Sequence, residues 1–193
     1  MAVLNSIFRS PLTGICLAIL VLWRSGEMSA SAQAASKEYQ VKAAFLYNFA
    51  QFIEWPSTAL TNADTPFCIG VLGDDPFGTA LEETVQGETI NGHKIIVEKA
   101  HRVKDLKNCQ MIFICKSEKG QLREIMSELD SSAVLTVSEI DGFAASGGVI
   151  NFYLDGSKVR FEINPATAQH DGLKVSSQLL SLGKIIQGGR EGE

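Results

Sequence analysis

The sequence has few of the residues that metal binding and acid–base catalysis use. Its 193 residues include three histidines, His93, His101 and His170, and none stands in an H-E-x-x-H, H-x-H or G-x-S-x-G pattern. His93 and His101 flank a short predicted strand, a spacing that favours surface positions over a shared metal. We therefore predict no metal site. No nucleophile, base and orienting group can be assembled into a catalytic centre either, so no catalytic residue is assigned.

A basic surface for nucleic acid is also lacking. Lys and Arg number 17 against 22 Asp and Glu and are scattered along the chain, whereas phosphate binding needs a clustered basic stripe. The segment Gly70–Gly73 lacks the G-x-G-x-x-G pattern of a nucleotide loop, and the carboxylates of Asp74 and Asp75 after it would repel a phosphate. We interpret these two carboxylates as helix-capping groups, and we predict neither nucleic acid nor a cofactor as a ligand.

The first 34 residues have the features of a cleavable export signal. An apolar run, Leu12–Trp23, follows Arg9, and two overlapping A-x-A patterns end at Ala32 and Ala34. The run is about a dozen residues long, whereas a membrane span needs ~20. We therefore predict cleavage near Ala32 or Ala34 and a periplasmic location.

The rest of the sequence indicates one α/β domain over residues 35–186, followed by a polar tail, residues 187–193. Continuous apolar runs alternate with helical patterns, which predicts a mainly parallel sheet with helices on both faces and right-handed crossovers. The expected strands are 67–72, 93–97, 111–115 and 133–137, and the expected helices after the first and third of them are 77–85 and 120–129.

The last third of the chain predicts a β-hairpin. Asp155 and Gly156 separate two alternating runs, 149–154 and 159–164, and an Asp-Gly pair in this setting favours a tight turn. The alternation predicts that Val159, Phe161 and Ile163 face the core. It also predicts an outward-facing row, which we assign as a partner-binding surface: Arg160, Glu162 and Asn164.

Two helices are expected after the hairpin. Asn164 and Pro165 begin a helix that runs to about His170, and Gly172 ends it. Ser176 caps a closing helix, whose expected buried side is Leu179, Leu180, Leu182, Gly183 and Ile186.

The stretch 37–56 predicts a helix with an apolar face that ends at Trp55 and Pro56. An aromatic stripe with helical spacing favours core packing, and its members are Phe45, Phe49 and Phe52 with Val41 and Ile53. Exposed aromatic residues are typical of interface anchors. The alternative interpretation is therefore that this helix helps to form a homodimer interface or a ligand groove through Tyr39, Tyr47 and Trp55.

Three cysteines follow the predicted signal. If the runs that open at Cys68 and Cys109 are neighbouring parallel strands, both residues lie at the same end of the sheet, whereas Cys115 is roughly 20 Å further along at ~3.3 Å per residue. A disulfide needs Cα atoms within ~7 Å, so a bond between Cys68 and Cys109 is favoured. The alternative is three buried, unpaired thiols.

Four sequence blocks, in this order, resemble the YfiR family: KAAFLYNF with EWP, GGVINF, RFEIN and GLKVSSQLLSLGKII. The resemblance implies a layered α/β fold and a non-enzymatic periplasmic regulator. Such a protein represses a membrane-bound diguanylate cyclase of the YfiN type by binding its periplasmic sensor domain, which lowers cyclic-di-GMP output and biofilm formation. The resemblance also implies a homodimer, and an outer-membrane lipoprotein of the YfiB type that sequesters the repressor.

One feature of the family does not carry over. YfiR proteins can have a second cysteine pair in the segment around GG, but residues 143–153 contain no cysteine here. The pair Cys68 and Cys109 carries over, and Cys115 has no obvious partner.

A second class of function stays open, a periplasmic small-molecule-binding module that feeds another membrane sensor. In that case the loops after Leu72 and Cys115 would line the cleft, at the carboxyl ends of parallel strands.

Overall fold

The computed structural model describes residue 33, residues 36–60, residue 62 and residues 64–187. The chain divides into two units, Met1–Glu38 and Tyr39–Glu193. Both predicted cleavage positions, Ala32 and Ala34, lie outside the described residues, as do nearly all of the predicted signal and residues 188–193 of the predicted tail. Among the helices that are described, none has the length and apolar character needed to cross a membrane.

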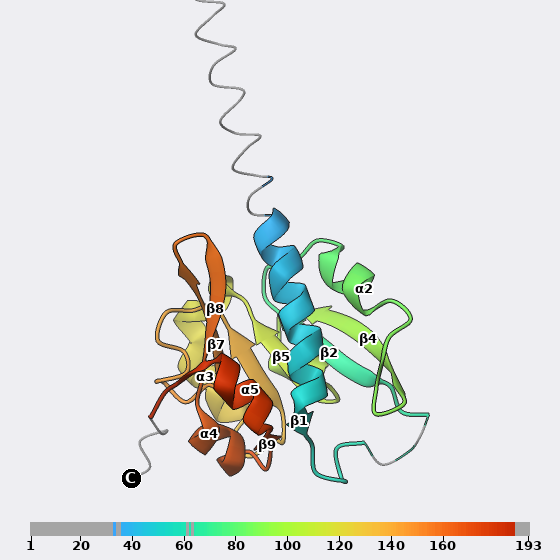
Figure 1. The fold of residues 1–193 in the computed structure, drawn as a ribbon. Coiled ribbons are helices and arrows are strands. Elements are labelled where there is room, and N and C mark those ends of the chain that lie inside the picture. Colours follow the sequence, from blue (N-terminus) through green and yellow to red (C-terminus); the bar gives the residue numbers. More distant parts are fainter. Residues whose placement is uncertain (1–32, 34–35, 61, 63, 188–193) are drawn as a thin grey trace, which may run out of the picture. The chain divides into compact units, whose positions relative to one another are not determined.

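The second unit is built on an eight-stranded, mostly parallel sheet with the order β10-β8-β7-β6-β5-β2-β4-β3 (Figure 1). Each expected strand is present. The apolar runs of β2, β5 and β6 are buried along their whole length, as suits strands covered on both faces, whereas β4 has no buried residue and alternates between half-buried and exposed along most of its length. The parallel strands are β2 (Phe67–Leu72), β4 (His93–Ala100), β5 (Met111–Ile114), β6 (Leu135–Ser138) and β7 (Ile150–Asp155).

The sheet is completed by short strands at its margins. The hairpin brings β8 (Lys158–Ile163) back antiparallel to β7, and β3 (Thr89–Ile90) pairs antiparallel with β4. At the other edge β10 (Lys184–Ile185) runs parallel to β8. A separate antiparallel pair joins β1 (Ile53–Glu54) to β9 (Lys174–Val175).

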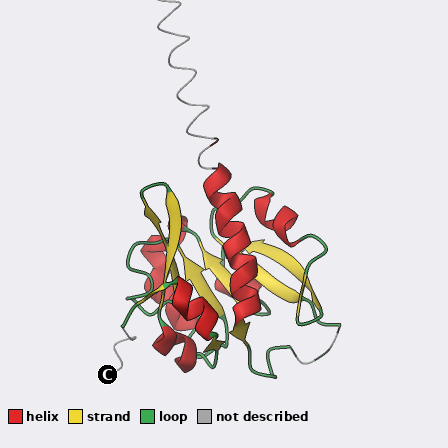
Figure 2. Cartoon of the chain, in the orientation of Figure 1, coloured by secondary structure: helices red, strands yellow, loops and turns green. Residues whose placement is uncertain are grey.

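Helices cover both faces of the sheet, as Figure 2 shows. The first helix runs over residues 36–52, and its part from Tyr39 onward packs on one face of the sheet with α2 (Ala80–Val85). The opposite face carries η1 (Val103–Leu106) and α3 (Leu122–Glu128), and α3 continues from η2 (Lys116–Gln121). The last third adds α4 (Pro165–His170) and α5 (Ser177–Leu182). The mixed α/β class and the layered arrangement predicted from the sequence are therefore confirmed.

Helix α2 begins later than its sequence predicts. Asp75 Oδ1 accepts a hydrogen bond from the backbone N–H of Phe77 at 2.8 Å, so this carboxylate closes a turn instead of capping a helix. Gly78 then has a φ of 60°, a left-handed conformation that a right-handed helix cannot contain. The helix consequently starts at Ala80.

The first helix buries the predicted aromatic stripe, with one exception at its start: Phe49 and Ile53 are buried, Phe45 and Phe52 pack against the core, and Val41 does not. Phe49 is buried against Phe152 and Phe161 of the hairpin, with ring centroids 5.5 and 4.9 Å away. Val41, however, is 45% exposed, whereas the neighbouring Lys42 is 2% exposed. The assignment of Val41 to the core stripe is therefore wrong, because a buried ion pair described below turns Lys42 inward.

The structure contains the predicted disulfide between Cys68 and Cys109, which lie 41 residues apart in the sequence. Cys68 is the second residue of β2 and Cys109 lies just before the neighbouring β5, so both thiols meet at the amino ends of these strands. Cys115 is a free, buried thiol at the other end of β5. The alternative of three unpaired thiols is wrong.

Asn164 does not belong to the outward row. Its side chain is fully buried: Oδ1 accepts a hydrogen bond from the backbone N–H of Thr167 at 3.1 Å, and Nδ2 donates to the carbonyl of Ala144 at 2.9 Å. Strand alternation stops at Ile163, because Asn164 is the N-cap of α4. The predicted outward orientation of Asn164 is wrong.

The closing helix is shorter than expected. Ser176 caps α5 through its hydroxyl, which accepts a hydrogen bond from the backbone N–H of Leu179 at 3.2 Å. The helix ends at Leu182, and the chain then turns into the edge strand β10. Leu179 is buried as predicted, but Leu182 is 66% exposed, so its assignment to the buried side is wrong.

Candidate functional site

The order of the strands creates a switch point at the carboxyl end of the sheet. From β2 the chain moves to β4 on one side, and it later returns to β5 on the other side. The loops after β2 and β5 therefore diverge, and ligands of open α/β sheets bind at such a point. The two loops touch, since Ser117 Oγ accepts a hydrogen bond from the backbone N–H of Asp74 at 3.0 Å. Gly73 fits there because a Cβ atom would clash with Ser117 Oγ.

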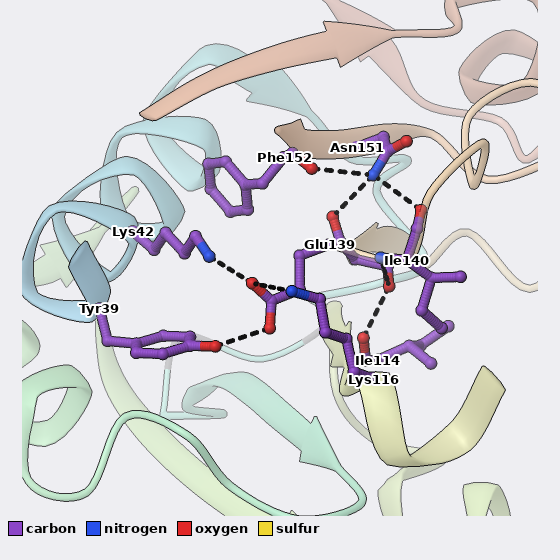
Figure 3. Close-up of polar contacts among 9 residues, drawn as sticks. Tyr39, Lys42, Ile114, Lys116, Glu139, Ile140, Asn151 and Phe152 are labelled. Atoms are coloured by element: carbon purple, nitrogen blue, oxygen red, sulfur yellow. Dashed lines mark hydrogen bonds and ion pairs between the residues drawn. The ribbon is translucent and has the colours of Figure 1, made fainter. Parts of the chain in front are cut away.

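A buried cluster of charged groups lies one strand further along. Glu139 directly follows β6, and its carboxylate forms a salt bridge with Lys42 of the first helix through Oε2. Tyr39 donates its hydroxyl proton to Glu139 Oε1 at 2.7 Å, and the exposed Lys116, after β5, places Nζ 3.6 Å from Oε2. Figure 3 shows these three side chains around the carboxylate. We call Tyr39, Lys42, Lys116 and Glu139 the Glu139 cluster.

The first helix supplies two members of this cluster because of its periodicity. Tyr39 and Lys42 are three residues apart and therefore lie on the same face. Lys42 Nζ also sits 4.5 Å from the centroid of the Tyr39 ring, a cation–π distance. The two side chains together join the first helix to the end of β6.

The backbone that carries Glu139 is fixed by hydrogen bonds from buried side chains. Asn151 Nδ2 donates to the carbonyls of Ser138, Ile140 and Phe152 at 3.3, 3.0 and 3.1 Å (Figure 3). Ser138 Oγ donates to the carbonyl of Ile114 at 2.7 Å and accepts from the backbone N–H of Ile140 at 3.1 Å. The carboxylate is therefore presented to Lys42 by a rigid loop.

The charges of the cluster compensate one another. Burial alone would raise the pKa of Glu139, but the hydrogen bonds from Lys42 and Tyr39, together with the positive charges of Lys42 and Lys116, outweigh burial and lower that pKa. Glu139 is thus ionised at neutral pH and engaged by three groups. Such a carboxylate is suited to holding elements together and is poorly suited to accepting a proton as a general base.

Cys115 lies near this cluster, and its thiol is unreactive at neutral pH. Burial, followed by the negative charges of Asp75, Glu139 and Glu118, raises the pKa of its thiol to about 12. The nucleophilic form of cysteine is the thiolate. At neutral pH Cys115 therefore stays protonated and does not serve as a nucleophile.

A pocket of about 270 Å³ opens on the other face of the sheet, beside the carboxyl end of β2. Leu72, Val103 and Ile125 give it apolar surface. Polar and charged side chains from different elements complete the lining: His101, Arg102, Lys104, Glu118, Gln121, Glu124 and Glu128. Leu72 and Glu118 belong to the regions that the small-molecule hypothesis assigned to a cleft.

The residues predicted to bind a partner lie elsewhere, on the hairpin. Arg160 is 51% exposed and forms a long ion pair with Asp155 at 3.8 Å. Glu162 is only partly exposed, because its Oε1 accepts a hydrogen bond from Lys184 Nζ of the edge strand at 2.8 Å. With Asn164 buried, Arg160 is the most accessible member of the predicted row.

The three aromatic residues predicted for a dimer interface or ligand groove point to three different partners. Tyr39 bonds Glu139, as described above. Tyr47 donates to Glu88 Oε2 at 2.7 Å, and Trp55 Nε1 donates to the carbonyl of Gln110 at 3.1 Å. Trp55 also packs edge-on against Phe67, with centroids 5.0 Å apart. A groove formed by all three stays a prediction.

Sequence reasoning missed Lys42 and Glu139. A signal for Lys42 was present, because it lies four and seven residues before the buried Leu46 and Phe49 and so shares their helical stripe. A lysine on an apolar stripe needs a buried counter-charge. Nothing local identifies Glu139 as that partner, since it lies 97 residues away.

Comparison with known proteins identifies a family and shows distant similarity to several solved structures, two of which are the following. A family model described as YfiR/HmsC-like matches residues 39–184. The comparison with curated proteins finds no match. One similar solved structure is described as the ABC domain in complex with L-Trp from Streptococcus pneumoniae, with 15% identity and a TM-score of 0.46, covering 66% of this chain and 58% of the other.

The second similar structure is a conserved domain protein from Vibrio cholerae O1 biovar El Tor. It has 11% identity and a TM-score of 0.47, and the match covers 62% of this chain and 54% of the other. The match thus covers less than two thirds of each of these two structures.

Proposed function

Because the chain belongs to the YfiR/HmsC-like family, we propose that it represses a membrane-bound diguanylate cyclase of the YfiN type by binding the periplasmic sensor domain of that enzyme. Cyclic-di-GMP output falls as a result. The family is periplasmic, regulatory and associated with cyclic-di-GMP signalling. The observation that carries the proposal is the family match over residues 39–184. The active form is a single domain, residues 35–186, released by cleavage of the signal in residues 1–34.

The chemistry of the Glu139 cluster supports a binding role over a catalytic one. Its carboxylate is held by Lys42 and Tyr39, and the nearby Cys115 is a protonated thiol whose pKa is about 12. Neither group is poised to attack a substrate. The cluster instead keeps the first helix fixed on the sheet.

The hairpin offers a surface for the sensor domain. Arg160 is exposed there beside two exposed apolar residues of β7, Tyr153 and Leu154. Arginine and tyrosine are enriched in protein interfaces. We assign the sensor-domain contact to Arg160 and its neighbours on the hairpin, with Glu162 as a secondary member.

The first experiment is a pull-down of the tagged protein from oxidised periplasm and detergent-solubilised membranes of its host. Mass spectrometry of the eluate should identify a membrane protein with a diguanylate cyclase domain. An outer-membrane lipoprotein of the YfiB type in the same eluate would add the proposed antagonist, and light scattering of the purified protein would test the homodimer. An eluate that holds no membrane protein with a cyclase domain would contradict the proposal.

Arg160→Glu is expected to weaken binding to the sensor domain at least tenfold. The substitution replaces an exposed positive charge by a negative one, and a charge mismatch at an interface weakens association. Binding is measured by interferometry with the isolated sensor domain. The control is Arg123→Glu, which changes the charge of an exposed arginine on α3 and should leave affinity unchanged. Equal affinity in both variants would show that the hairpin is not the contact surface.

The pocket beside β2 favours a second candidate function, a small-molecule-binding module that feeds another membrane sensor. A ligand at a hundredfold excess over its Kd should stabilise the protein by about 2.7 kcal/mol, which a thermal-shift screen of apolar and aromatic metabolites can detect. Gln121→Trp fills the pocket and should abolish the shift. Arg123→Trp, two residues further along on α3 but outside the lining, should retain it. A shift that survives Gln121→Trp would place the ligand elsewhere.

A further inference from the structure

Three chemically active side chains meet at the opposite end of β6 from the Glu139 cluster. Asp130 lies between α3 and β6, His170 is the last residue of α4, and Asp171 is the C-cap of that helix. His170 Nε2 lies 3.4 Å from Asp130 Oδ1. One ligand atom from each of the three residues lies within 4.8 Å of the others.

We propose that Asp130, His170 and Asp171 form a binding site for a divalent zinc ion. Two carboxylate oxygens and one imidazole nitrogen are a donor set that zinc accepts at distances of about 2.0–2.2 Å. Rotations of the exposed side chains of Asp130 and His170 would bring the three atoms to that distance. Three protein ligands leave the fourth tetrahedral position to water.

The imidazole decides which metal class fits. Magnesium and calcium prefer all-oxygen sites, whereas imidazole nitrogen suits zinc and its transition-metal neighbours. Another group of donor residues, Cys68, Glu98 and Cys109, is unsuitable, because both of its sulfur atoms are joined in the disulfide and offer no thiolate.

The burial of Asp171 independently favours a cation at this place. Its carboxylate belongs to a residue that is only 3% exposed, and a negative charge in such surroundings is costly unless positive charge compensates it. It interacts with the backbone of Ser131. A carboxylate has about four acceptor positions, so that interaction and a bound cation are compatible.

A bound zinc ion would connect α4 to the segment between α3 and β6. In the apo protein the connection includes the His170–Asp130 contact and a hydrogen-bond contact of 3.3 Å between Ser131 Oγ and His170 Nε2. The metal would add two coordinated carboxylates and so stabilise the folded state in proportion to zinc concentration. This inference does not depend on the proposed repressor function, because the site is remote from the hairpin surface.

The test is a zinc titration of tag-free protein purified from the periplasm and stripped with EDTA. Isothermal titration calorimetry should give one zinc ion per chain, with no response to magnesium. Zinc should also raise the melting temperature in a concentration-dependent manner.

His170→Gln and Asp130→Asn should each weaken zinc binding at least tenfold while leaving the apo melting temperature nearly unchanged, since both residues are exposed. They are preferred over substitutions of Asp171, whose burial links it to folding. The matched controls are His101→Gln and Asp141→Asn, exposed residues outside the cluster, which should bind zinc as the unmodified protein does. Zinc binding that is absent, or equal in all four variants, would overturn the proposal.

Discussion

Cys68→Ser is expected to lower the free energy of unfolding by about 2–5 kcal/mol, the usual cost of removing a native disulfide from a small exported domain. The bond joins residues 41 apart, and the chain-entropy model gives roughly 4 kcal/mol for a loop of that size. The bond also holds the amino end of β2 next to that of β5, where both cysteines are buried in a hydrophobic cluster with Val103, Leu106 and Ile112. Urea denaturation followed by circular dichroism measures the effect.

The control for this prediction is Cys115→Ala. Cys115 is buried but unpaired, so its replacement removes one sulfur atom from the core and should cost on the order of 1 kcal/mol. A reducing agent should destabilise the unmodified protein and the Cys115→Ala variant, and it should leave Cys68→Ser unchanged. If Cys68→Ser and Cys115→Ala lose the same stability, the bond between Cys68 and Cys109 is not the stabilising element.

Lys42→Met is expected to destabilise the protein by about 3–5 kcal/mol at neutral pH, the range for breaking a buried ion pair by removing one partner. The substitution keeps most of the side-chain volume but leaves the carboxylate of Glu139 buried without its main counter-charge. Lys158→Met, at an exposed lysine of β8, is the matched control and should change stability by less than about 0.5 kcal/mol.

The pH dependence gives this prediction a second readout. In the folded protein the pKa of Glu139 is lowered from 4.5, so its ionisation contributes stability above pH 4.5 that is lost as pH falls through the lowered value. Without Lys42 burial dominates, and the pKa of Glu139 should rise. The gap between Lys42→Met and the unmodified protein should therefore be largest at neutral pH and shrink as acid protonates the carboxylate.

A double substitution separates a lost ion pair from lost packing. Lys42→Met with Glu139→Leu removes both charges and should recover much of the stability lost by Lys42→Met alone, since apolar replacements of buried ion pairs are often neutral or stabilising. A double variant as unstable as the sum of the two single variants would show that the two residues act independently. The hydrogen bond from Tyr39 would then be the relevant contact.

The local elements could be predicted because their causes are local. The apolar run 67–72 became β2, and Asn164 and Pro165 began α4. The hairpin formed with its turn at Gly156 and Ser157, one residue later than predicted, because Asp155 is the last residue of β7 and pairs with Lys158. Each of these follows from neighbours within four residues, through side-chain periodicity, turn geometry and capping. The family resemblance carried by the four blocks agrees with the family match over residues 39–184.

Asn164 shows that a residue's orientation can be predicted wrongly even where the helix that begins beside it is predicted correctly. The same residue can extend a strand with its side chain outward or cap a helix with its side chain inward, and sequence alternation alone chose the first. The structure chose the second, because the buried amide reaches both Thr167 N–H and the carbonyl of Ala144. The second of these partners is brought near only by the folded chain.

The sequence by itself determined the order of the elements, the disulfide partners and the family. Only the tertiary structure decided that Lys42, and not Val41, turns inward, and that its ion-pair partner is Glu139, 97 residues away in the sequence. It also decided that Asp130 lies next to His170 and Asp171. The physical reason is that these contacts depend on strand order and on which loops share an end of the sheet. The periodicity of the sequence determines neither the strand order nor the neighbouring loops, because it indicates only which residues share a face within one helix or strand.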